Sequence, residues 1–444
     1  MPGLAGLPTH PSSGPVDPLS GPAGARDAGA SGAATTRGIP LLPASVRGVA
    51  AVTVGALTLP ALTVGALSLF GCSGDGDPTS PWDDAAFKAQ ATEVVDGYAA
   101  HVQGRYAETR ADAEALQAAV DGFLAAPSEA GLKSARDAWL AARTPYGTTE
   151  VFRFYGGPID GEPDNLEGQI NSWPLDEAYI DYVDGAEMSG IINDPATYPT
   201  IDAATLIAAN GALGEDTIST GWHAIEFLLW GQDFDPAGPG DRPYTDFVDG
   251  PEGTATNQER RRTYLKVVTD LLVEDLRAVE VAWAADQDDY RRTFVGDDPR
   301  ESLTKVLLGM GSLSGAELAG ERMTVAYETR EQEDEHSCFS DNTHMDLWAN
   351  AKGIQEVYVG DGGASLSALV RSRDPEVDQR LTAALEASVS AIAAIPPPFD
   401  AAIQAADGSP EREAVKAAID ALKEQTAAIA EAATLLEITL NLEE

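Results

Sequence analysis

The chain has few basic residues and few cysteines, and each shortage excludes a class of protein. Among its 444 residues, 29 are Lys or Arg and 71 are Asp or Glu, so the formal net charge at pH 7 is −42. Nucleic-acid binding is not expected, because a phosphate backbone needs a surface of Lys and Arg. The excess of carboxylates fits either attraction of cations or a merely solubilising surface. Only Cys72 and Cys338 occur, so a disulfide framework is excluded.

Familiar catalytic motifs are also absent. No His-Glu-x-x-His run occurs, so the usual zinc-peptidase helix with two His ligands and a Glu base is missing. A Gly-x-Ser-x-Gly turn and a phosphate-binding loop are missing as well. Cys338 has His336 and His344 near it in the sequence, so a Cys–His nucleophile stays open as an alternative.

The N-terminal region has the composition of a targeting segment. Residues 1–45 are rich in Pro, Gly, Ala and Ser, which predicts a disordered leader. Residues 46–72 are mostly apolar and end in Gly71-Cys72, which resembles a lipoprotein signal with Cys72 as the lipidated residue. A membrane anchor or a plain signal peptide stays open, since the apolar run is long enough to span a bilayer. All three place the folded part outside the cytoplasm, after a flexible tether at 73–83.

Apolar residues recur at helical spacing through the rest of the chain. From Phe87 they step at three and four positions, which predicts a buried helical face, and no alternating β pattern of useful length occurs. The sequence therefore predicts an all-α fold of two helical-bundle halves, at about 84–235 and 257–442. Helices are expected at 87–123, 128–145, 203–209, 216–230, 257–285, 300–333, 343–356, 375–394 and 410–439. Residues 145–200 are expected to form either a long ordered loop or short helices, and residues 232–256 a loop.

The helix expected at 300–333 is unusually rich in glycine. It contains Gly309, Gly311, Gly315 and Gly320. Each glycine weakens a helix interior by about 1 kcal/mol relative to Ala. The sequence therefore predicts that another helix or a ligand approaches this one closely.

The segment GWHAIEFLLWG is the most informative in the chain. Between Trp222 and Trp230 every residue is apolar except His223 and Glu226, and a helix that is apolar all round is buried. Residues three apart share a helix face, and a buried carboxylate must be paired, protonated or bound to a cation. Two interpretations stay open: a His–Glu pair that only orders the core, or half of a metal site.

Two ligands do not hold a metal, so others would come from elsewhere in the chain. Glu317 and Glu321 lie four apart on the glycine-rich helix, where Arg322 could neutralise one of them. His336 lies in a very polar run that we expect to form a solvated helix end, and His344 follows it. Carboxylate-rich ligands with one imidazole favour iron, with zinc as the alternative.

These motifs resemble the imelysin family. GWHAIEFLLWGQD matches its Gly-x-His-x-x-Glu signature, and the resemblance covers about residues 85–440. Its iron-regulated protein A branch is matched by AWLAARTPYGTTEVFRFYGGPID, INSWPLDEAYIDYV, SGAELAGERM and EQEDEHSCFSDNTHMD. The resemblance implies an exported, often lipid-anchored, all-helical protein with duplicated halves, classed with the M75 metallopeptidases. It implies a centre between the halves that includes His223 and Glu226, with Glu150, Arg153 and Asp176 in matching motifs.

Three functions follow as hypotheses. The leading one is a lipid-anchored, metal-binding protein of iron acquisition in the periplasm or outer membrane of a bacterium. The second is a metallopeptidase in which Glu226 acts as general base on a metal-bound water. The third is a non-catalytic adhesion or peptide-binding module that uses the cleft between the halves. The expected partners are a metal ion or a peptide, with membrane contact through the lipid anchor only.

Overall fold

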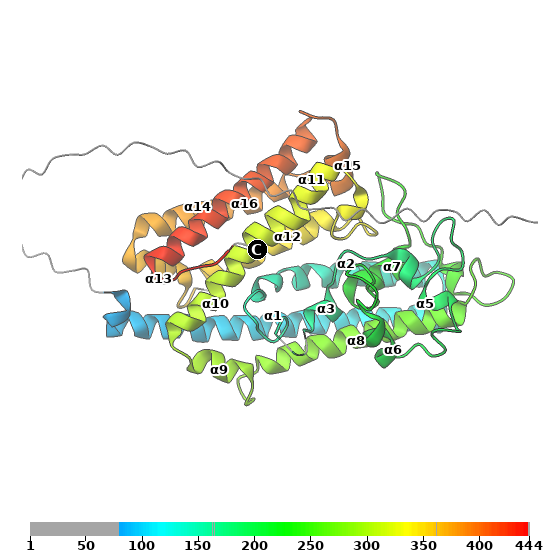
Figure 1. Cartoon of the computed structure of the whole chain (residues 1–444), viewed down its shortest axis with the longest axis horizontal. Helices are drawn as coiled ribbons and strands as arrows, with labels where there is room; N and C mark the ends of the chain where they lie inside the picture. The colour runs from blue at the N-terminus through cyan, green and yellow to red at the C-terminus, as the bar shows by residue number, and fades with distance from the viewer. Residues whose placement is uncertain (1–79, 162, 164, 361, 443–444) are drawn as a thin grey trace, which may run out of the picture. The chain divides into compact units, whose positions relative to one another are not determined.

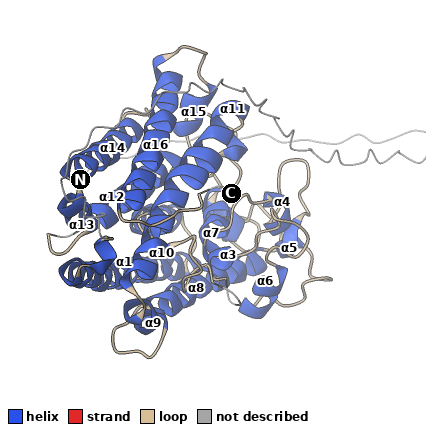
Figure 2. Cartoon of the chain, turned by 60° about the vertical axis from the view of Figure 1, so that its left-hand side comes forward, coloured by secondary structure: helices blue, strands red, loops and turns tan. Residues whose placement is uncertain are grey.

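The computed structural model describes residues 80–442 apart from 162, 164 and 361. The predicted leader, the apolar run and Cys72 lie outside the described residues. Within them no strand is formed, and Val183 and Ala186 make one isolated bridge. None of the helices found there combines the length and apolar character that crossing a membrane requires. The all-α class is confirmed (Figure 2).

The long helices agree with the predicted ones to within a few residues, except that the helix expected at 300–333 is divided into an α-helix, a π-helix and a short α-helix. They are α1 (Ala85–Ala125), α2 (Glu129–Gly147), α7 (Gly221–Trp230), α8 (Gln258–Ala282), α10 (Pro299–Ser312), α12 (Thr343–Val359), α14 (Pro375–Ala393) and α16 (Pro410–Leu435). The shorter α-helices are α3 (Glu167–Ile170), α4 (Glu177–Ile180), α5 (Gly190–Asn193), α6 (Ala203–Ala209), α9 (Tyr290–Gly296), α11 (Ala326–Thr329), α13 (Leu366–Arg373) and α15 (Phe399–Gln404). Short 3₁₀ turns are η1 (Pro81–Asp83), η2 (Glu150–Phe152), η3 (Tyr244–Phe247) and η5 (Gln332–Asp334), and η4 (Leu313–Val325) is a π-helix.

The long helices form two groups by their contacts. In the first, α1 packs against α2 and α8, and α7 packs against α2 and α8 (Figure 1). In the second, α14 and α16 pack together, α12 packs on α14, and α16 packs on η4. Helix α8 lies at the start of the predicted second half, and it packs on α1 and α7 through a buried face that includes Tyr264, Leu265, Val268 and Leu272.

Capping residues explain where the first helices begin. Asp84 accepts a hydrogen bond from Ala86 N at the start of α1, and Ser128 accepts one from Gly131 N at the start of α2. Residues 81–83, predicted as part of a flexible tether, instead form η1, where the buried Trp82 donates from Nε1 to Leu436 O at 2.7 Å. The end of the predicted tether is therefore anchored to the C-terminal part of the chain.

Of the four glycines predicted to permit close approach, Gly309, Gly311 and Gly315 do so, whereas a Cβ on Gly320 would make an ordinary 3.4 Å contact with Gly315 O. A Cβ on Gly309 of α10 would lie 2.5 Å from the Val151 carbonyl oxygen of η2. A Cβ on Gly353 of α12 would lie 2.4 Å from Thr148 O, which follows α2. Distances this short exclude a side chain. The two groups of helices are thus held in backbone contact around η2, close to the polar centre described next.

Candidate functional site

Helix α7 begins at a position that favours glycine strongly. Gly221 has φ +85°, and a Cβ there would lie 2.4 Å from the carbonyl oxygen of Ile170 in α3. This close approach lets all ten residues of α7 be buried. His223 and Glu226 are both 0% exposed, so the predicted burial of this pair is confirmed.

His223 and Glu226 are hydrogen-bonded to each other, and Glu226 also accepts hydrogen bonds from Ser340. His223 Nδ1 lies 3.0 Å from Glu226 Oε2. The other carboxylate oxygen, Oε1, accepts from Ser340 N at 3.0 Å and from Ser340 Oγ at 2.7 Å. Burial raises the pKa of Glu226 to about 8 despite these donors. The carboxyl group is therefore satisfied inside the fold and reaches no solvent.

A second buried pair lies beside the first. Arg143 of α2 donates from Nε to both carboxylate oxygens of Asp346 in α12, at 3.3 Å for Oδ1 and 3.1 Å for Oδ2, and from Nη2 to Oδ2 at 3.0 Å. Their side chains are 0% and 1% exposed. Asp346 also accepts from Ser337 Oγ at 2.6 Å and from Asn342 Nδ2 at 2.9 Å. A buried ion pair of this kind persists because hydrogen bonds satisfy the remaining lone pairs.

The Arg143 guanidinium links this ion pair to two imidazole rings. Its Nη2 lies 3.4 Å from His223 Nε2 and 3.2 Å from His336 Nδ1, and the two ring centroids are 4.7 Å apart. His336 Nδ1 also lies 3.0 Å from Asp346 Oδ2. Burial, reinforced by nearby arginines, lowers the pKa of both histidines well below its ordinary value. Both rings are therefore neutral at pH 7.

A shell of alternating charges surrounds this centre. Arg322 of η4 donates to Glu150 Oε2 at 2.5 Å and to Glu317 Oε1 at 2.7 Å. Arg153 donates to Glu150 Oε2 at 3.0 Å and pairs with Glu167 at 3.1 Å. Burial alone would raise the pKa of Glu150, but the two guanidinium groups lower it to about 2. Glu150 is thus ionised, and Arg322 and Arg153 neutralise its charge.

A pocket of about 360 Å³ opens onto the centre from this shell. His336 lines it, and so does Trp173, whose ring centroid lies 4.9 Å from that of His223. The charged residues of its wall are Arg153, Glu167, Glu317, Glu321, Arg322 and Asp334. A small ligand in this pocket would meet His336 and the surrounding ion pairs, with His223 behind Trp173.

The structure brings most of the predicted residues together, and it corrects one expectation. His336 is 3% exposed and belongs to the centre, although its polar sequence context predicted a solvated helix end. Glu321 is exposed at the pocket wall. Asp176 lies apart, where it caps α4 by accepting from Ala178 N. His344 Nδ1 lies 3.1 Å from the Asp341 carbonyl oxygen.

Sequence reasoning missed the residues that connect the centre. Arg143, Asp346, Asn171 and Ser340 were not singled out. Asn171 accepts from Arg143 Nη1 at 2.5 Å and donates to Glu150 Oε1 at 3.3 Å, so it joins the centre to its shell. The available signal was an arginine in the apolar run AWLAAR, on the face that also carries Trp139.

The donor chemistry suits a metal only in part. Each imidazole has its Nδ1 next to a carboxylate, as metal-binding histidines usually do. Arg143 contacts both rings, however, and its charge opposes a cation at the same place. In the described part of the chain, no group of three or more His, Cys, Asp and Glu side chains is placed to hold a metal ion.

These observations define the class of protein: it has an all-helical fold, with a buried polar centre on a helix that carries the sequence Gly-x-His-x-x-Glu. The imelysin family model matches residues 102–429, and the chain belongs to this family. Iron-regulated protein A of Synechococcus elongatus is 26% identical over 309 residues, which cover 66% of this chain and 73% of the relative.

Two solved structures share the fold. One is described as an iron-regulated protein A precursor from Parabacteroides distasonis; it has a TM-score of 0.61 and 20% identity, and the match covers 79% of this chain and 95% of that one. The other is an imelysin-like protein from Psychrobacter arcticum, with a TM-score of 0.59 and 15% identity, covering 80% and 98% of the two chains. At these identities the likeness concerns the fold alone.

Proposed function

We propose that the chain is an extracytoplasmic, lipid-anchored protein of iron acquisition that binds a metal ion, preferentially iron, at the His223–Glu226 centre. The observation that carries the proposal is the pair of neighbouring imidazoles, each with a carboxylate at its Nδ1. Such carboxylates fix the orientation of metal-binding rings and raise their basicity. The similarity to iron-regulated protein A supports iron as the metal.

The position of Arg143 decides whether His223 Nε2 is available to a metal ion. Its Nη2 lies 3.4 Å from His223 Nε2, the nitrogen that is not engaged by Glu226. A cation held by His223 and His336 would replace the guanidinium there, since two positive groups repel strongly in a buried site. Asp346, already bonded to His336, would remain as the counter-charge.

Equilibrium dialysis against Fe²⁺, Fe³⁺ and Zn²⁺, with metal content measured by mass spectrometry, tests the proposal. The His223→Ala and Glu226→Gln variants should lose at least tenfold in affinity. His101→Ala is the matched control, because His101 lines a separate pocket on α1. Equal binding by the wild type and by the two centre variants would refute the site.

Lipid anchoring is tested separately at Cys72. Labelling of cells with a palmitate analogue should mark the wild-type protein, while Cys72→Ser should leave it unlabelled. Loss of the gene from its native cell should lower cellular iron under iron limitation. If the cellular iron content is unchanged while the purified protein still binds metal, metal binding stands and the role in iron acquisition is refuted.

Hydrolysis is less well supported by the geometry than binding. A general base must reach a water molecule on the substrate. Glu226 is 0% exposed, both its oxygens are hydrogen-bonded, and it lines none of the described pockets. The metallopeptidase hypothesis therefore has no supporting contact at this residue.

A further inference from the structure

Three pockets adjoin one another on the side of the chain where α7 ends. The first, of about 330 Å³, shares Glu177 and Glu333 with the second, of about 240 Å³. The second shares Gln232, Asp233 and Phe234 with the third, which has about 570 Å³. Together they form one continuous depression, the acidic groove. Its volume is in the range of ligand sites and far above the roughly 30 Å³ of one water.

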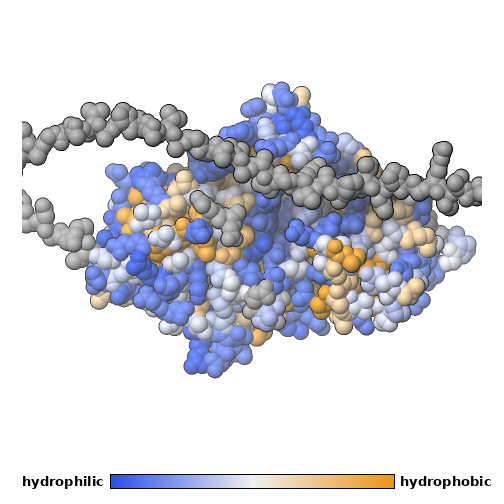
Figure 3. Space-filling model, viewed as in Figure 1, coloured by the Kyte–Doolittle hydropathy of each residue, from blue (hydrophilic) through white to orange (hydrophobic). Residues whose placement is uncertain are grey.

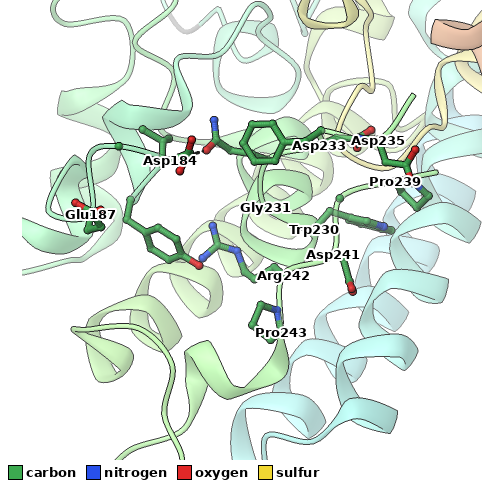
Figure 4. Close-up of a pocket in the computed structure, with 16 residues that line it drawn as sticks. Asp184, Glu187, Trp230, Gly231, Asp233, Asp235, Pro239, Asp241, Arg242 and Pro243 are labelled. Carbon is green, nitrogen blue, oxygen red and sulfur yellow. Dashed lines mark hydrogen bonds between the residues drawn. The ribbon is translucent and has the colours of Figure 1, made fainter. Parts of the chain in front are cut away.

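The groove carries unneutralised negative charge. Acidic side chains line all three pockets, and none of them forms an ion pair with another described residue. In the third pocket Asp184 and Glu187 lie on one side and Asp235 and Asp241 on the other (Figure 4). This absence of pairing sets the groove apart from the centre, where arginine neutralises the acids.

The one basic side chain among the residues lining these pockets is already paired. Arg242 is 4% exposed and donates to Asp181 at 2.7 Å and to Asp246 at 3.3 Å. Its guanidinium also lies over the rings of Tyr182 and Phe227, with centroid distances of 5.1 and 5.2 Å. Arg242 is therefore engaged below the groove, and among the lining acids Asp241 interacts with the charge of Arg136, which lines none of these pockets.

Neutral hydrogen-bond donors hold the groove acids in place. Glu177 accepts from Gln232 Nε2 at 3.2 Å, and Asp233 accepts from Asp235 N at 2.9 Å. Burial, with the nearby carboxylate of Glu333, raises the pKa of Glu177 to about 7. A positively charged ligand would reduce the repulsion between the Glu177 and Glu333 carboxylates.

Aromatic side chains give the groove an apolar component. Phe234 is 72% exposed and lies where the second and third pockets meet. Phe339 lines the first two pockets, and Trp173 lines the first pocket as well as the pocket over the centre. Lys and Arg side chains suit such a surface, because their stems pack on aromatic rings while their charges meet carboxylates.

We infer that the acidic groove binds an extended, positively charged peptide segment. Its adjoining pockets exceed the space that a hydrated ion needs, and its lining combines acidic with aromatic side chains, which suits a chain of Lys or Arg with apolar residues. This inference does not depend on metal binding at the centre. Because the chain carries a net charge of −42, the groove acids could instead serve only to keep the protein soluble. The experiment must exclude this alternative.

The test is fluorescence anisotropy with the full chain and a labelled eight-residue peptide of alternating Lys and Phe. The same peptide with Glu in place of Lys is the ligand control. The groove variant is Glu177→Gln/Glu333→Gln. Its matched control is Glu386→Gln/Glu424→Gln, which removes the same charge from exposed positions on α14 and α16 that line none of these pockets.

We expect at least tenfold tighter binding of the Lys peptide than of the Glu peptide, weakening as salt rises. The groove variant should bind at least fivefold more weakly, and the control variant within twofold of the wild type. Equal weakening by both variants would overturn the inference, because it would mean a general effect of surface charge. Absence of binding by the Lys peptide would also overturn it. Metal dialysis of the groove variant should match the wild type, so failure here is distinguishable from failure at the centre.

Discussion

The buried Arg143–Asp346 pair should be strongly coupled, and a double-mutant cycle measures this. Arg143→Met leaves the Asp346 carboxylate 1% exposed with only neutral donors, from Ser337, Asn342 and His336. Removing one partner of such a pair costs about 3–5 kcal/mol of unfolding free energy. Asp346→Asn should cost a similar amount, because it leaves the guanidinium buried. The double variant should be less destabilised than the sum by about 2 kcal/mol.

Urea unfolding at pH 7, followed by circular dichroism, gives the four free energies. The matched control is Lys133 and Asp137, also on α2, which are 2.7 Å apart with side chains 72% and 60% exposed. Their coupling should be about 0.5 kcal/mol or less, since solvent screens exposed pairs. If the free-energy losses of the two single variants add up to that of the double variant within about 0.5 kcal/mol, as for independent sites, the predicted coupling between Arg143 and Asp346 is refuted.

Three further predictions concern packing and pH. Gly309→Ala should destabilise by about 1–3 kcal/mol, because its Cβ would meet the Val151 carbonyl oxygen, whereas Gly104→Ala, with open space around it, should stabilise by about 1 kcal/mol; thermal unfolding compares them. Burial raises the pKa of Asp275 to about 7 in the folded chain, so the free energy of unfolding falls as pH rises from about 4 to 7. Asp275→Asn should therefore raise the free energy of unfolding by up to about 4 kcal/mol at pH 8 and by progressively less below pH 7. A gain that stays constant with pH would contradict the raised pKa. Affinity for the Lys peptide should fall as pH drops from 8 to 6, because Glu177 is protonated through its pKa of about 7, and Glu177→Gln should flatten this dependence.

The helical fold could be predicted from the sequence because its long helices have regular apolar faces. The face from Phe87 to Phe123 is buried as expected, and Ser128 caps α2. Short helices such as α3 and α4 could be predicted only as an alternative to a long loop at 145–200, since four residues are too few to show a period. Their positions depend on contacts with distant segments, for example the approach of Gly221 to Ile170.

The site was predictable only in part. His223 and Glu226 stood out because two polar residues interrupt an apolar helix. His336 was misjudged because sequence context reports the polarity of neighbours along the chain, whereas its burial comes from Trp173 and Arg143. Arg143 and Asp346 are 203 positions apart, and a single sequence contains no signal that pairs them.

The π-helix η4 ties the centre to a precise chain length. In a π-helix the hydrogen bonds join residues five apart, so Glu317 and Arg322 fall on the same side and can bond. Removing a single residue between Leu313 and Val325 would favour an ordinary α-helix and turn every later side chain by about 100°. Arg322 would then lose Glu150, and the charge shell would open. The contacts of Arg322 with Glu317 and Glu150 therefore fix the register of this helix, and length changes among relatives should avoid this segment.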